Sequence, residues 1–291
     1  MEEALTFLDI EIQRRDDPFI RTQKESIIAY IKLILVEISG RAVQGGSYHK
    51  LAKILGSNDS VITFNWDTML EEIFSQHGLS IHANYRKEFF EHQTSNQMKA
   101  RLPYDITPHS SLINHYIKLH GSLDWYDCRN SACRQFKLPF CHNPQFERPH
   151  CGECNENMAE IIIPPLLTKN FDQFSVIRKS WHLAGQVIRQ ARSIIFWGYS
   201  LPPTDFAAKY LFLNNKAHHL QNITLINPEV IPKAKKPNSY RFTFIRKFYD
   251  MYRSHLNKTY VYLYENFDDF SNDLTIEAKY SISRKNLLAG L

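Results

Sequence analysis

Short apolar runs that end in polar residues place the strongest limit on how this chain of 291 residues can fold. Segments with the apolar spacing of helices lie between most of these runs. Strands that alternate with helices pair in parallel, because each helix returns the chain to the same end of the sheet. We therefore predict an α/β fold, a Rossmann-like parallel sheet with helices on both faces. The predicted strands are residues 61–67, 113–120, 161–163, 193–199 and 223–228.

The predicted helices are recognised by their ends. Residues 1–40 carry apolar residues at helical spacing, and the part from Glu25 to Ser39 stops at Gly40, a residue type that commonly closes a helix. Residues 80–112 show no period and contain two prolines, so we predict a long surface connection there. Further helices are predicted at 48–55, 68–74, 174–192 and from a cap at Thr204 or Asp205 through Asn215.

Two of the predicted strands end in residues that can do chemistry. Asn65 and Asp67 close the first run, and His120 follows another, with Gly121 allowing the backbone to turn away. Ligands of open α/β sheets bind beyond the carboxyl ends of the strands. Two interpretations stay open for each group: a ligand site, or a helix cap for Asn65 and Asp67 and a buried turn histidine for His120.

Four cysteines have the spacing of a structural zinc site. Cys128-x4-Cys133 and Cys151-x2-Cys154 form two pairs, and four thiolates fill a tetrahedral site completely. We predict a small zinc-ribbon-like insertion at residues 121–160. Cys141 fits neither pair and is predicted to be a free buried thiol; alternatives are His142 or His150 as a ligand, or a reduced loop without metal.

Composition favours a globular cytoplasmic protein. The formal net charge is +5, and 43% of the residues are hydrophobic. The sequence has no uninterrupted apolar run of roughly 18 residues, as a membrane span would need. The first residues, with Glu2 and Glu3, lack the basic and apolar regions of a secretory signal. We expect no membrane association.

Basic residues concentrate in the stretch 233–258. Such a patch could meet a nucleic acid or an acidic protein. The interleaved aromatic residues, Phe248 among them, are better explained as the core of a closing strand and helix. We therefore do not expect a nucleic-acid partner.

The order of these motifs resembles the sirtuin family, in particular its bacterial branch that hydrolyses NAD in anti-phage defence instead of deacylating lysine. The resemblance covers about residues 1–270 and includes details of that branch at Ile162–Pro165, Lys169–Asn170 and Tyr199–Asp205. The matching stretches are Ile62–Asp67, Lys118–Ser122, the cysteine pairs, Gly198–Leu201 and Leu225–Pro228.

The resemblance implies roles for individual residues. Asn65 would hold the nicotinamide ribose and orient the attacking water, Asp67 would support Asn65, and His120 would be the acid/base near the ribose hydroxyls. Breaking the bond between nicotinamide and ribose needs polar positioning and a base more than a strong nucleophile. The remaining NAD-binding residues would be Thr63, Gly198, Ser200 and Asn227, the last two on the adenosine side.

One family feature is missing from the sequence. Sirtuins open with a strand and a glycine-rich loop that cradles the pyrophosphate, whereas none of the ten glycines of this chain forms a G-x-G pattern. Gly45-Gly46-Ser47 is a weak substitute and reads more simply as a turn. We expect either a chain that begins downstream of the true start or a degenerate family member, and in both cases weak NAD binding.

These observations predict a sirtuin-like NAD-binding domain over residues 1–275, interrupted by the zinc-binding insertion at 121–160 and followed by a tail at 276–291. The expected function is hydrolysis of NAD to nicotinamide and ADP-ribose in anti-phage defence. Two rivals stay open: a non-catalytic nucleotide-binding or scaffold protein, and an NAD-dependent protein-lysine deacylase. The expected partners are NAD or a related nucleotide, with a second copy or another protein as a further candidate.

Overall fold

The structure is a computed structural model, and the chain divides into two compact units, residues 1–181 and 182–291. Helix α6 (Ser175–Gln190) runs across the division. The predicted boundaries of the NAD-binding domain and of its insertion stay predictions. The described residues are 2–40, 46–79, 114–128, 130, 133, 136–137, 150–151, 153–164, 174–202, 205–215, 217, 219–230, 245–248, 251–252 and 259–274.

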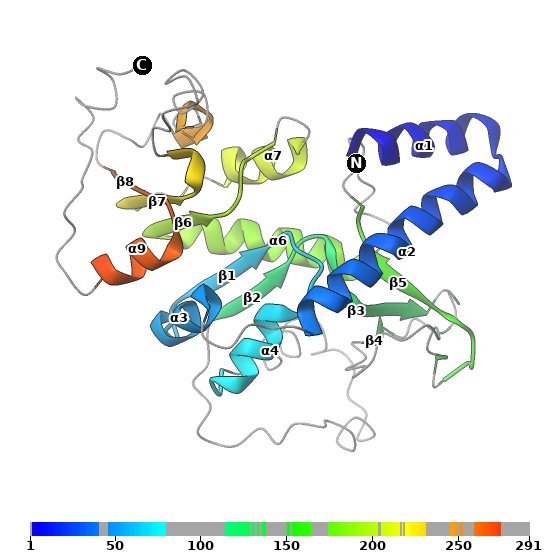
Figure 1. Cartoon of the computed structure of the whole chain (residues 1–291), viewed down its shortest axis with the longest axis horizontal. Coiled ribbons are helices and arrows are strands. Elements are labelled where there is room, and N and C mark those ends of the chain that lie inside the picture. Colours follow the sequence, from blue (N-terminus) through cyan, green and yellow to red (C-terminus); the bar gives the residue numbers. More distant parts are fainter. Residues whose placement is uncertain are drawn as a thin grey trace. The chain divides into compact units, whose positions relative to one another are not determined.

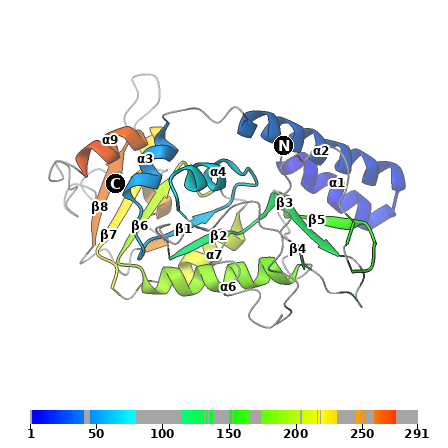
Figure 2. The same cartoon turned by 90° about the horizontal axis from the view of Figure 1, so that it is seen from below.

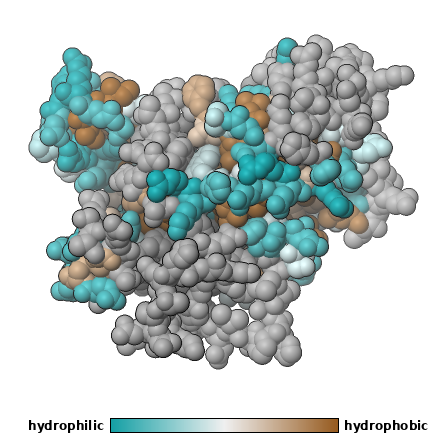
Figure 3. Space-filling model, turned by 180° about the vertical axis from the view of Figure 1, so that it is seen from behind, coloured by the Kyte–Doolittle hydropathy of each residue, from teal (hydrophilic) through white to brown (hydrophobic). Residues whose placement is uncertain are grey.

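The first unit begins with a helical hairpin, α1 (Glu2–Arg15) and α2 (Pro18–Gly40), as the sequence predicts (Figure 1). The second helix starts earlier than expected, because Asp17 accepts a hydrogen bond from Phe19 N and Pro18 suits a first helical position. Figure 3 shows a largely hydrophilic hairpin with some hydrophobic residues on its surface. Phe7 and Tyr30 are among the large side chains of the hairpin that are exposed.

A parallel pair of strands forms the centre of the first unit. β1 (Ser60–Thr63) pairs with β2 (His115–Lys118), and the register joins Thr63 to Lys118. Helices α3 (Ser47–Ile54) and α4 (Met69–Gln76) lie on one side of this pair, and the start of α6 lies on the other (Figure 2). Apolar residues of these elements, including Phe74, Tyr116 and Ile177, form a common buried core.

An antiparallel sheet continues directly from β2. β3 (Gly121–Cys128) pairs with β4 (Phe136–Lys137) on one side and with β5 (Met158–Ile162) on the other. An ion pair between Lys32 and Glu160 joins α2 to β5. The predicted insertion therefore contains regular strands, and the strand predicted at 161–163 belongs to this sheet and not to a parallel one.

The second unit has a three-stranded parallel sheet in the order β6 (Ser193–Trp197), β7 (Asn222–Ile226) and β8 (Tyr260–Tyr264). Neighbouring residues of a strand point to opposite faces. Phe196 packs on Phe212 of α7 (Phe206–Asn214), with ring centroids 5.1 Å apart, whereas Trp197 packs on Phe267 of α9 (Phe267–Asp273), at 4.3 Å. The predicted arrangement of helices on both faces is thus confirmed.

Some predicted bounds were wrong. The strand expected through Asp67 ends at Thr63, because Asn65 N donates to the Thr63 hydroxyl at 3.1 Å and the chain turns. Among the described residues of the strand expected over 113–120, the strand runs from His115 to Lys118. β8 and α9 had not been predicted. The surface connection at 80–112, Cys141, His142 and the tail at 276–291 lie outside the described residues, as does most of the basic stretch 233–258.

Candidate functional site

The ends of β1 and β2 bring Asn65 and His120 to the same edge of the sheet. The two strands are parallel, and Thr63 and Lys118 are the last paired residues. Asn65 and His120 each lie two residues beyond this pair, and Leu119 N extends the pairing by donating to the Thr63 carbonyl at 3.0 Å. Residues separated by 55 positions in the sequence therefore follow the carboxyl ends of two paired strands, and their joint role in a site stays a prediction.

His120 lies among aromatic rings and is only 7% exposed. Its ring centroid is 5.3 Å from that of Phe64 and 6.2 Å from that of Trp181. The Trp181 indole is itself fixed, because its Nε1 donates to the Leu119 carbonyl at 2.8 Å. Asn65, in contrast, is exposed. Asn65 thus offers a solvent-facing side-chain amide, and His120 offers an imidazole that is fixed by the rings of Phe64 and Trp181.

Thr63 and Asp67 stabilise the turn between β1 and α4. The Thr63 hydroxyl accepts from Asn65 N, and Asp67 Oδ1 accepts from Met69 N at 3.2 Å at the start of the helix. Burial, and then the negative charge of Asp67, raises the pKa of Tyr48. The bond to Met69 N matches the helix-cap interpretation of Asp67, and the predicted support of Asn65 by Asp67 stays a prediction.

Gly121 allows the chain to reverse after His120. Its φ is +82°, a conformation that side chains with a Cβ rarely adopt, and a Cβ there would lie 1.9 Å from the Ile161 carbonyl oxygen. The His120 carbonyl accepts from Ile163 N at 2.8 Å, so β5 fixes the turn from the other side. Glycine at position 121 is therefore a structural requirement of this turn.

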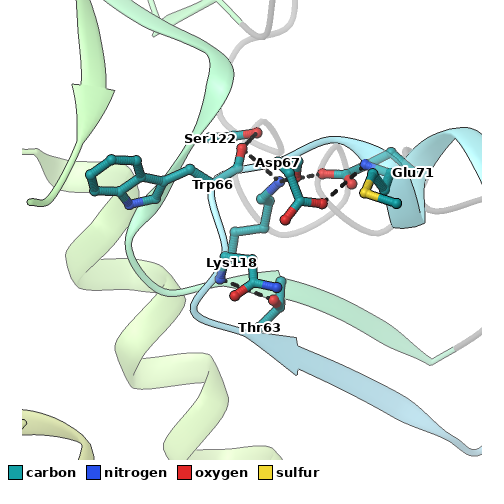
Figure 4. Close-up of polar contacts among 8 residues, drawn as sticks. Thr63, Trp66, Asp67, Glu71, Lys118 and Ser122 are labelled. Atoms are coloured by element: carbon teal, nitrogen blue, oxygen red, sulfur yellow. Dashed lines mark hydrogen bonds and ion pairs between the residues drawn. The ribbon is translucent and has the colours of Figure 1, made fainter. Parts of the chain in front are cut away.

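A buried charge cluster beneath the turn was missed by the sequence analysis (Figure 4). Lys118 is 0% exposed, and its Nζ lies 2.6 Å from Glu71 Oε1. Burial raises the pKa of Glu71; the Lys118 ammonium opposes this shift and the Asp124 carboxylate adds to it. The available signal was a single lysine between Ile117 and Leu119, since a charge inside an apolar strand needs a buried partner.

The four predicted cysteines meet at the far end of the antiparallel sheet. Their sulfur atoms all lie within 4.8 Å of one another, and the closest contacts, Cys128 to Cys154 and Cys133 to Cys151, are both 3.4 Å. These distances are far longer than a disulfide bond of about 2.05 Å. A tetrahedral zinc with Zn–S bonds of about 2.3 Å would place its sulfurs about 3.8 Å apart. The donor set and spacing therefore fit zinc.

Backbone amides favour the thiolate form of one of these cysteines. Burial opposes ionisation of Cys151, but hydrogen bonds from the amides of Cys154 and Glu153 and from the neighbouring thiols outweigh it and lower its pKa to about 6. His150 is exposed and contacts the Asn155 carbonyl oxygen through Nδ1 at 3.1 Å, so it lies outside the described cysteine cluster.

The other predicted NAD-binding residues lie in the second unit. Gly198 follows β6 with a φ of +68°, and its N–H donates to the Ile226 carbonyl at 3.0 Å. Asn227 follows β7 and is buried, with Oδ1 accepting from Glu229 N at 2.9 Å. Ser200 is exposed, and its carbonyl accepts from Lys247 at 3.4 Å. Gly198 and Asn227 thus lie at the carboxyl ends of neighbouring parallel strands.

The weak glycine candidate Gly46 lies at the start of α3. The described element before it is α2, so it does not follow a strand as a dinucleotide-binding loop would. None of the described helices combines the length and the apolar character that a transmembrane span requires.

No protein-family model and no curated protein matches the chain, but solved sirtuin structures resemble it. One, from work on the structural basis of sirtuin substrate affinity, is 14% identical, covers 79% of this chain and 70% of its own, and has a TM-score of 0.38. A mutant Sir2 homologue in complex with 2'-O-acetyl ADP ribose is 16% identical, with coverages of 93% and 79% and a TM-score of 0.41. A Sir2 homologue in complex with NAD is 16% identical, with coverages of 84% and 65% and a TM-score of 0.37. At these TM-scores the likeness is loose and assigns no role to an individual residue of this chain.

Proposed function

We propose that this chain binds NAD and hydrolyses it to nicotinamide and ADP-ribose. The observation that carries the proposal is the parallel register of β1 and β2, in which the last paired residues, Thr63 and Lys118, precede Asn65 and His120 by two positions each. The sequence resemblance described above points to the same two residues. Water adds its oxygen to the ribose carbon as the bond to nicotinamide breaks, and one proton is released.

The two residues would divide the work according to their surroundings. The exposed amide of Asn65 can donate to and accept from a ribose hydroxyl or a water molecule. The imidazole of His120, packed against Phe64 and Trp181, can accept a proton at near-neutral pH from a fixed position. Thr63 would contribute by accepting a hydrogen bond from the backbone N–H of Asn65. Asp67 would contribute by accepting one from Met69 N at the start of α4.

The test is to incubate the purified protein with NAD and to measure nicotinamide and ADP-ribose, with and without an acetylated peptide. Release without peptide supports hydrolysis, whereas strict dependence on the peptide would identify a deacylase. Replacing His120 or Asn65 by alanine should lower the rate by about 10² to 10⁴ fold, the usual loss for a positioned acid/base group.

Matched controls separate catalysis from folding. His182 and Asn114 are exposed residues of the same two types, and alanine at either position should leave the rate unchanged. Thermal unfolding should show that His120→Ala and Asn65→Ala remain folded. A His120→Ala variant as active as the wild type would contradict the role assigned to the imidazole.

A second function, nucleotide binding without catalysis, is favoured by one specific observation. The sequence contains no G-x-G pattern, and in the described part of the chain the element before Gly46 is the helix α2. Backbone amides of a glycine loop usually supply the pyrophosphate contacts, so binding should be weak without them. Retained binding of NAD or ADP-ribose by calorimetry, together with no release of nicotinamide, would establish this function and exclude the hydrolase.

We also propose that the four cysteines hold a structural zinc, with Cys128, Cys133, Cys151 and Cys154 as ligands. Four thiolates would leave no open position for substrate, so the metal would stabilise the sheet of β3 to β5 and take no part in hydrolysis. The cytoplasmic location, the role in anti-phage defence and association with a second copy or another protein are proposals supported by the sequence alone.

A further inference from the structure

Lys118 lies in a position where a lysine is rarely tolerated. The residue is fully buried at the end of β2, between the equally buried Ile117 and Leu119. An ammonium group removed from water is strongly destabilising unless hydrogen bonds and an opposite charge replace the lost hydration. The contacts of Lys118 therefore indicate why the strand carries this residue.

The ammonium group of Lys118 contacts one short segment of the chain, from Trp66 to Glu71 (Figure 4). Nζ donates to the Asp67 carbonyl and to Glu71 Oε1, and it lies 3.5 Å from the Trp66 carbonyl oxygen. Two of these three acceptors are backbone atoms of the turn between β1 and α4. Glu71 alone would be enough to neutralise the charge of Lys118, so the two carbonyl contacts indicate a further role for the ammonium group.

The same turn carries Asn65. The Trp66 carbonyl also accepts from Leu123 N at 2.9 Å and from the Ser122 hydroxyl at 3.3 Å. These groups, together with Lys118, hold the inner side of the turn, while Asn65 faces solvent on the outer side. Lys118 also precedes His120 by two residues on the same strand, so one side chain links the positions of both proposed catalytic groups.

We propose that Lys118 is a positioning residue whose ammonium group fixes the Trp66–Asp67 backbone so that Asn65 is presented beside His120. The catalytic consequence rests on the proposed hydrolysis of NAD, whereas the ordering of the turn does not. Lys118 does not touch substrate, because it is buried beneath the turn.

The experiment compares Glu71→Gln with the double variant Lys118→Met/Glu71→Gln. Lys118→Met alone leaves a buried carboxylate without its cation, which is strongly destabilising, whereas the double variant removes both charges of the pair at similar volume. Glu71→Gln removes the opposite charge but keeps an oxygen acceptor at position 71 and the bonds from Lys118 to the two carbonyls, so the ammonium group stays hydrogen-bonded in this reference variant. Lys53→Met, which removes an exposed lysine of α3, is the matched control.

Hydrogen exchange gives the readout that does not depend on activity. The amides of Asn65, Met69 and Leu123 report on the turn, because each makes a bond that depends on its shape. In the double variant they should exchange about tenfold faster or more than in Glu71→Gln, since a charge-assisted bond to a carbonyl is lost. Equal exchange in the two variants would overturn the proposal.

Kinetics tests the catalytic consequence. The double variant should lose about 100-fold in kcat with little change in KM, because misplacement of the reacting groups affects the transition state more than binding. A kcat equal to that of Glu71→Gln would refute the catalytic role. If the wild type does not hydrolyse NAD at all, the proposed function fails, and the exchange measurement still decides whether Lys118 orders the turn.

Discussion

β3 is fixed by different chemistry at its two ends. At Gly121 the constraints come from the polypeptide itself: a left-handed turn, the carbonyl bonds around Leu119 and His120, and the buried Lys118–Glu71 pair. At Cys128 the small buried cluster includes two of the cysteines, and four thiols meet there without a disulfide. The stability of the Gly121 end should therefore change with substitutions at Gly121 and with pH. The stability of the Cys128 end should change with the supply of metal.

Removing the metal should produce the largest effect, and only at the cysteine end. Binding of zinc by thiolates contributes on the order of 10 kcal/mol of folding free energy in small modules. We expect Cys151→Ser to lose zinc, measured by elemental analysis, and to expose the amides near Cys128 to exchange while those near Gly121 stay protected.

Cys141, which belongs to neither spaced pair, provides the control for this comparison. Cys141→Ser should keep the full zinc content. One zinc per chain in a variant without Cys128, Cys133, Cys151 and Cys154 would show that the metal binds elsewhere.

Gly121→Ala should be the most destabilising single change at the other end. The left-handed conformation costs about 1–2 kcal/mol for a residue with a Cβ, and the clash with the Ile161 carbonyl adds about 1–3 kcal/mol. Gly78 also has a positive φ, of +68°, but a Cβ there meets nothing within 4 Å. Urea unfolding should therefore show a clearly smaller loss for Gly78→Ala, and equal losses would argue against the clash.

The Gly121 end should also respond to pH through Glu71. Burial raises the pKa of Glu71 in the folded protein, so folding favours the protonated form. The stability from this group is complete below the pKa of an unfolded glutamate, about 4.3, and is lost as the pH rises through the higher folded pKa. Charged groups that face Glu71 are Lys118 on β2 and Asp124 on β3.

The measurement is the free energy of unfolding of wild type and Glu71→Gln between about pH 4 and pH 8. Relative to the variant, the wild type should lose stability as the pH rises. A relative gain with pH would mean that pairing with Lys118 outweighs burial and that the direction of the shift is wrong.

The smallest expected effect concerns Trp181. Its indole donates to the Leu119 carbonyl at 2.8 Å and packs beside His120. Trp181→Phe keeps an aromatic ring but removes this bond, which should lower the free energy of unfolding by about 0.5–1.5 kcal/mol without changing the zinc content. A loss of zinc in this variant would show that the two ends of β3 are not independent.

The sequence alone was sufficient to predict those features that depend on the local pattern of residues along the chain. The apolar runs predicted the strands β1, β2, β6 and β7, because a buried parallel strand reads as a continuous apolar segment. The cysteine spacing predicted which four thiols meet, because the geometry of a metal site restricts how far apart its ligands lie in the chain. The parallel pairing of β1 and β2 was also predicted, and it places Asn65 and His120 just beyond the carboxyl ends of paired strands.

Only the tertiary structure decided features that depend on partners far apart in the chain. The sequence marks Lys118 as an interruption of a strand, but its pairing with Glu71 and its bonds to the Asp67 backbone follow from the packing of α4 beneath the turn. The need for glycine at position 121 likewise comes from the closeness of Ile161 on another strand. The periodicity of the sequence indicates which residues are buried. The packing of the helices and strands determines which group each buried residue contacts.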